Sequence, residues 1–116
     1  MINLSSVAVV LTTVAADADG VALARTLVGE GLAACVNVLP SMQSVYRWHH
    51  AVQVEREQQL VIKTAPANLS ALEARLHELH PYELPEFLVL SAEGSLAYVA
   101  WVGAANIDGS DPAEGG

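Results

Sequence analysis

Two long β-like stretches joined by a very short connection constrain this chain more than any other feature. The first runs from Leu32 to Trp48 and the second from about Val52 to Thr64, and neither has a helical period. The connection between them is only about Trp48 to Ala51. Two strands joined by so short a connection must be antiparallel. Each arm has about 13 residues or more, against ~5–6 in a usual strand, so the hairpin is expected to project beyond the rest of the sheet.

Two places in this hairpin are unusual for extended strands. Pro40, in the first arm, cannot donate a ladder hydrogen bond, which predicts a bulge, a bend or an edge. His50 lies where a tight turn favours a positive φ, a conformation that glycine adopts more easily. The exposed pair His49-His50 lacks carboxylate or cysteine neighbours and would bind a metal weakly, so we interpret it as part of the turn.

The segments around the hairpin alternate between strand and helix patterns. They predict, in chain order, a strand at 7–11, a helix at 21–28, the two hairpin arms, a helix at 69–79, a strand at 87–90 and a last helix at 95–102. The order β-α-β-β-α-β plus a C-terminal helix indicates an α+β fold with the split βαβ arrangement called ferredoxin-like.

Six apolar residues of the hairpin have no helix of their own chain left to cover them in this arrangement. These are Val36, Val38, Leu39, Val45, Val52 and Val54. Another copy of the protein is the simplest cover for such a surface, so the pattern predicts a homo-oligomer.

Length and charge limit the organisation and the partners. A chain of 116 residues supports one domain, expected over residues 1–103, and the Gly-, Asp- and Ala-rich residues 104–116 are expected to form a disordered tail. With 13 Asp and Glu against 5 Lys and Arg, the formal charge of −8 argues against nucleic acid or an anionic membrane surface as the main partner. The single cysteine, the lack of a basic start and the lack of a long apolar run predict a cytoplasmic protein.

The densest polar cluster lies between His77 and Glu86, around a helix end held by prolines. Its histidines, His77 and His80, either ligate a metal or simply suit the negative end of the helix dipole. Lys63 is either a snorkelling edge residue or a partner for Glu83 or Glu86.

Other polar and aromatic residues favour structural interpretations. Cys35, among small apolar residues, is more typical of packing than of a nucleophile or ligand. Glu55 and Glu57 alternate along a strand and indicate a solvated or intersubunit face. Trp48 and Trp101 are better candidates for interface anchors than for a cofactor site. No phosphate-binding glycine loop, Ser-His-Asp pattern or Cys-x-x-Cys motif is present, so no catalytic residues are expected.

Several runs, in order and collinear over about residues 6–102, resemble the CutA family of divalent-cation tolerance proteins. The runs are Leu32-Ala33-Ala34-Cys35-Val36-Asn37, Tyr46-Arg47-Trp48, Glu57 with Leu60-Val61-Ile62-Lys63-Thr64, His80-Pro81-Tyr82-Glu83-Leu84-Pro85-Glu86, and Tyr98 with Trp101. The resemblance implies a stable homotrimer of ferredoxin-like subunits, similar in architecture to PII signalling proteins, whose clefts between subunits bind small effectors. It also implies an association with tolerance to copper and other divalent cations, and it brings no established catalytic activity.

Two positions depart from the pattern that some relatives show. Thr12 and Leu79 replace a cysteine and a histidine proposed as copper ligands, so only His80 remains of that trio. The first hypothesis is therefore a metal-responsive trimer that binds Cu(II) or another divalent cation weakly through His80, with Glu83 and Cys35 as further ligands.

The second hypothesis is a PII-like small-molecule sensor or scaffold with clefts between subunits. These clefts would be lined by Lys63, Tyr82, Glu86 and Trp48. A hydrolase of the acylphosphatase type shares the topology, but the chain has no phosphate-cradling loop after its first strand.

Overall fold

The computed structural model describes residues 4–108, which fold into one antiparallel sheet and three α-helices. In chain order the elements are β1 (Leu4–Ala15), α1 (Gly20–Gly29), β2 (Cys35–Val38), β3 (Met42–Trp48), β4 (Ala51–Thr64), the 3-10 turn η1 (Pro66–Asn68), α2 (Leu69–Leu79), β5 (Leu88–Ser95) and α3 (Leu96–Asp108). The predicted order of strands and helices is confirmed, with the first hairpin arm divided into β2 and β3.

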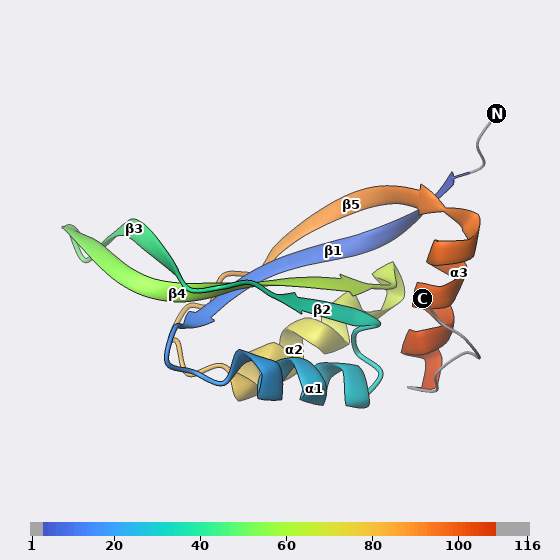
Figure 1. Ribbon diagram of the computed structural model, residues 1–116, viewed down its shortest axis with the longest axis horizontal. Helices are drawn as coiled ribbons and strands as arrows, with labels where there is room; N and C mark the ends of the chain where they lie inside the picture. Colours follow the sequence, from blue (N-terminus) through green and yellow to red (C-terminus); the bar gives the residue numbers. More distant parts are fainter. Residues whose placement is uncertain (1–3, 109–116) are drawn as a thin grey trace.

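The sheet has the strand order β2-β4-β1-β5, and β3 continues past β2 along the outer half of β4. All of these pairs are antiparallel. Helices α1 and α2 cover the same face of the sheet, whereas α3 stands at the end opposite the hairpin, as Figure 1 shows. The β3–β4 hairpin therefore extends beyond both covering helices.

The main core lies between the sheet and the helices α1 and α2. Val10 of β1 and Ile62 of β4 are fully buried against Leu27 of α1 and Leu72 of α2. The leucine spacing of 69–79 explains this arrangement, because every third or fourth residue of a helix faces the same side. Each such side chain contributes about 1.5–3 kcal/mol when it is fully buried.

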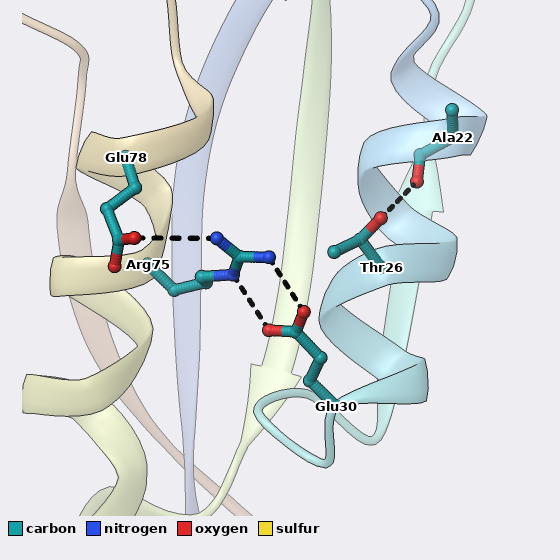
Figure 2. A network of polar contacts seen from close by, with 5 residues as sticks. All are labelled: Ala22, Thr26, Glu30, Arg75 and Glu78. Carbon is teal, nitrogen blue, oxygen red and sulfur yellow. Dashed lines mark hydrogen bonds and ion pairs between the residues drawn. The ribbon is translucent and has the colours of Figure 1, made fainter.

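Polar contacts on the outer surface join α1 to α2 (Figure 2). The Arg75 guanidinium donates to both carboxylate oxygens of Glu30 at 2.8 Å and lies 3.5 Å from Glu78. The hydrogen bond from Arg75 lowers the pKa of Glu30, although burial partly opposes it. At the start of α1, the Asp19 side chain accepts from the backbone N–H of Ala22 at 2.9 Å and caps the helix.

The hairpin agrees with both local predictions. The first arm is interrupted between Val38 and Met42, around Pro40, while β4 continues unbroken for 14 residues. At the tip, His49 has a φ of 49° and His50 a φ of 65°. Two positive φ values in a two-residue loop are typical of a type I′ turn, whose twist matches that of the flanking strands.

Two predictions need correction. Val36 and Val38 are half-buried because α1 lies against β2, so they do not belong to the uncovered surface. In contrast, Val45, Val52 and Val54 of the outer hairpin are 61–67% exposed. The predicted tail beginning at residue 104 is wrong for 104–108, which continue α3, and residues 109–116 lie outside the described part.

No helix within residues 4–108 is long and apolar enough to cross a membrane.

Candidate functional site

A pocket of about 600 Å³ lies where the hairpin leaves the helix-covered part of the sheet. Strand β1 contributes Thr13, β3 contributes Tyr46 and Trp48, and β4 contributes Glu57. The remaining wall is the segment 82–88, which joins α2 to β5. Three separate parts of the chain therefore meet at one site.

Strand register explains why these side chains converge. Glu57 of β4 pairs with Met42 of β3 and with Ala15 of β1. Because alternate residues of a strand share a face, Tyr46 and Trp48 lie on the same side as Met42 and therefore as Glu57. This is the sheet face opposite α1 and α2.

A buried carboxylate forms the floor of the pocket. Glu57 is only 8% exposed, and its Oε2 accepts a hydrogen bond of 2.9 Å from the Tyr82 hydroxyl. Burial, together with the hydrogen bond to Glu57, raises the pKa of Tyr82 far above its usual range. Tyr82 therefore stays a neutral donor, fixed on Glu57, at every physiological pH.

Glu86 is held to the sheet by Gln59. The Gln59 side-chain amide donates to the Thr12 carbonyl oxygen at 2.6 Å and to Glu86 Oε2 at 3.1 Å. This double contact positions the Glu86 carboxylate at the pocket wall, next to Phe87.

His80 is buried behind the pocket, at the end of α2. Its Nε2 lies 2.6 Å from the Thr13 carbonyl oxygen, and its Nδ1 accepts from the backbone N–H of Tyr82 at 3.1 Å. Because a carbonyl oxygen only accepts, Nε2 carries the proton, and the Nδ1 lone pair is used by Tyr82. Both ring nitrogens are thus engaged, and a metal ion would have to displace one of these bonds.

The predicted metal ligands are not all brought together. Cys35 pairs with Lys63, which pairs in turn with Val9, whereas His80 contacts Thr13. Four residues of β1 separate Val9 from Thr13, a distance of roughly 13 Å, so Cys35 and His80 do not share one centre. Glu83 does line the pocket. Within residues 4–108, no group of three or more His, Cys, Asp or Glu side chains is arranged to hold a metal ion.

The two positions that depart from the family pattern belong to the core. Thr12 is fully buried, and its hydroxyl has no hydrogen-bond partner among residues 4–108. Leu79 packs against the main hydrophobic cluster.

Of the predicted cleft residues, Trp48, Tyr82 and Glu86 meet in the pocket and Lys63 does not. Lys63 Nζ donates instead to Asn37 Oδ1 on β2, so the predicted pairing with Glu83 or Glu86 is not formed within the chain.

Sequence reasoning missed two important lining residues, Tyr46 and Glu57. The assignment of Glu57 to a solvated face is wrong, because Glu57 is only 8% exposed and Tyr82 lies over it within the same chain; the alternative of an intersubunit face stays a prediction. Cross-strand register would have placed Glu57 beside Tyr46, since a two-residue turn at His49-His50 fixes every pairing of the hairpin.

Comparisons with known proteins agree with this architecture. Residues 8–105 match the family described as CutA1 divalent ion tolerance protein. The divalent-cation tolerance protein CutA of Thermus thermophilus is 41% identical over 95 residues, which cover 81% of this chain and 92% of that protein.

Solved structures extend the agreement to three dimensions. The structure of CutA from Synechococcus elongatus has a TM-score of 0.82 at 40% identity and covers 90% of this chain and 96% of its own. A structure described as PII-like protein CutA from Nostoc, in apo form, has a TM-score of 0.80 at 34% identity, with 85% and 96% covered.

Proposed function

The chain belongs to the CutA1 family of divalent ion tolerance proteins, and from this premise we propose that it serves divalent-cation tolerance as a ligand-binding homotrimer. The names of its relatives describe tolerance to cations and no chemical reaction. We therefore assign a binding role and no catalytic one.

Two uncovered apolar surfaces, on opposite faces of the sheet, support the trimer. Val45, Val52 and Val54 of the hairpin are 61–67% exposed, and Leu88 and Leu90 of the edge strand β5, on the pocket face, are 53% and 52% exposed. Such surfaces are unusual for an isolated domain, and copies of the same chain would bury them. Sedimentation equilibrium should give the mass of three chains, whereas a single-chain mass at micromolar concentration would disprove the assembly.

The pocket supports a sensor or scaffold role that resembles PII architecture. Its volume of about 600 Å³ is within the roughly 300–1,000 Å³ that small-molecule sites occupy. Trp48, Tyr82 and Glu86 would contact the effector, and Lys63 would reach such a cleft only from a neighbouring subunit.

A thermal-shift screen of metabolites tests this role. A ligand that binds the folded state raises the unfolding midpoint by mass action, and Trp48→Ala should abolish the shift. Arg47→Ala, on the other face of β3, is the matched control and should keep it. Hits that survive Trp48→Ala would place the ligand elsewhere.

Direct metal binding is the second candidate, favoured by the imidazole of His80, which is buried behind the pocket, and by the carboxylate of Glu83, three residues later in the pocket lining. His80 would be the main ligand and Glu83 a helper for Cu(II) or another divalent cation, with weak affinity because a hydrogen bond of His80 must be broken first. Cys35 lies too far away to join this centre.

Calorimetric titration with Cu(II) separates this candidate from unspecific binding. The heat should be lost in His80→Ala and kept in His77→Ala, an exposed histidine of α2 whose ring contacts only the helix backbone. Circular dichroism first establishes that both variants are folded. Equal heats from all three proteins would eliminate His80 as a ligand.

We assign this role to the cytoplasm, because the only cysteine, Cys35, is free and fits a reducing compartment. Cell fractionation with an antibody to the protein would test the assignment. Recovery in a membrane or an oxidising compartment would contradict it.

A further inference from the structure

The charge of the pocket is one-sided. Glu57, Glu83 and Glu86 contribute three carboxylates to its lining, and the lining within residues 4–108 contains no Lys, Arg or His. The only other polar side chains there are hydroxyls and the indole N–H, from Thr13, Tyr46, Tyr82 and Trp48. An anion such as a phosphate would therefore meet repulsion without a compensating cation from the same chain.

Glu57 is the unusual member of this set. It is more than nine-tenths buried, and within residues 4–108 it makes no salt bridge; its one hydrogen bond comes from the neutral Tyr82 hydroxyl. Buried carboxylates are normally paired with a cation, because removal from water penalises the charged form. Glu57 thus lines a cavity to which residues 4–108 of its own chain bring no positive charge.

The shape of the lining selects the kind of cation. No three acidic or metal-ligating side chains of the described residues are close enough to hold a metal ion, so the three carboxylates do not converge on one point. The same lining carries the rings of Tyr46, Trp48, Tyr82 and Phe87. Aromatic faces attract alkylated ammonium groups, and such ligands are large enough to touch rings and separated carboxylates together.

From this charge and shape we propose that the pocket binds the positively charged end of a small organic molecule, an alkylammonium or guanidinium group, with Glu57 as its counter-ion. The inference rests on the proposed ligand-binding role of the pocket and adds the chemical class of the ligand. It distinguishes the pocket from a phosphate-recognising site and from a metal centre.

Two probes of equal shape and different charge test the proposal. Choline carries a permanent positive charge, and 3,3-dimethylbutan-1-ol is its neutral counterpart. Trp48 serves as the reporter in a Trp101→Phe background, because Trp101 belongs to α3 and does not line the pocket, and the chain has 2 tryptophans. We expect choline to change Trp48 fluorescence saturably, with a dissociation constant at least roughly tenfold lower than that of the alcohol.

Matched variants assign the effect to Glu57. Glu57→Gln keeps an acceptor for Tyr82 and removes the charge, and it should weaken choline binding by roughly tenfold. Glu55→Gln changes the net charge equally on the same face of β4, outside the pocket, and should change the affinity less than about twofold, as expected for a solvent-screened charge. If Glu57→Gln does not fold, Glu83→Gln in the exposed rim replaces it, with a smaller loss expected.

The outcomes separate the ligand class from the pocket's role. Equal affinity for choline and the alcohol, or tighter binding of inorganic pyrophosphate at Trp48, would overturn the cation proposal and leave a ligand-binding pocket. No response to choline at millimolar concentration would also overturn it. A metabolite shift lost in Trp48→Ala would still support the proposed function in either case.

Discussion

Strand β4 passes through two different environments, and the comparison between its halves shows what decides burial in this fold. In the half covered by α1 and α2, Leu60 and Ile62 are fully buried, whereas Val52 and Val54 in the hairpin are 64% and 61% exposed. The two pairs lie on the same face of β4, and all four side chains are aliphatic. The difference lies in the neighbours, because helices of the same chain cover one half and no helix of residues 4–108 covers the other.

The largest effect is expected in the covered half. Leu72→Ala removes a fully buried side chain between α2 and the sheet and should lower the free energy of unfolding by about 2–5 kcal/mol. Urea denaturation at fixed protein concentration measures the change. A loss no larger than that of an exposed-site variant such as Ala71→Gly would show that α2 packs loosely.

A substitution in the hairpin should weaken the assembly of the subunits and leave the fold of each chain unchanged. Val54→Lys places a charge opposite Val45, on a surface that we propose is buried between subunits. It should dissociate the homotrimer, with a loss of about 1.5–3 kcal/mol per subunit from the apolar burial alone.

Sedimentation analysis and circular dichroism together measure this outcome. The variant should be monomeric and keep its secondary structure. Glu55→Lys, next along the strand, is the control for charge. A trimer that tolerates Val54→Lys would mean that this hairpin face stays in solvent.

Substitutions in the turn should raise the stability of the chain. His49 and His50 both adopt left-handed backbone conformations, which asparagine and glycine occupy more readily. The double variant His49→Asn, His50→Gly should raise the free energy of unfolding by about 1 kcal/mol. Thermal unfolding checks it, and an unchanged or lower midpoint would indicate that the imidazoles make stabilising contacts in the assembly.

The smallest effect is expected where the two halves of β4 meet, at Glu57 and the Tyr82 hydroxyl bonded to it. Burial raises the pKa of Tyr82 in the folded state, so above about pH 10 the unfolded chain releases a proton that the folded one retains. Stability should therefore fall as the pH rises, by less than about 1 kcal/mol between pH 10 and 11 for this group, because solvent screens the partly exposed ring.

Tyr82→Phe should reduce this alkaline slope. The control is Tyr46→Phe in the hairpin, since the pKa of Tyr46 is also raised by burial but that ring is 40% exposed. Denaturant midpoints measured across the alkaline range provide the comparison. Equal slopes for the two variants would place both rings in the same environment.

Local patterns predicted most elements because local forces decide them. The leucines of 69–79 need only a helix and a sheet to pack on, and Pro40 interrupts a strand wherever it stands. The turn at His49-His50 likewise follows from its two residues and the long flanking strands.

The site was less predictable because its geometry is set by distant segments. Glu57 and Tyr82 are 25 residues apart and meet only through the path of the segment after α2. The pattern of imidazoles and carboxylates indicated a polar site near His80, but only the structure shows that both ring nitrogens are already bonded. Lys63 lies on the same strand as Gln59, and Gln59 contacts Glu86. Lys63 itself is four residues further along β4 and does not line the pocket.

The interruption at Pro40 has a mechanical consequence. Because β2 and β3 are separate there, β4 alone runs without a break from the helix-covered sheet to the tip of the hairpin. Glu57 stands near its midpoint, six residues from Ala51, so the outer part behaves as a lever roughly 20 Å long with its fulcrum at the pocket. A tilt of about 5° at that fulcrum displaces His49 and His50 by roughly 2 Å.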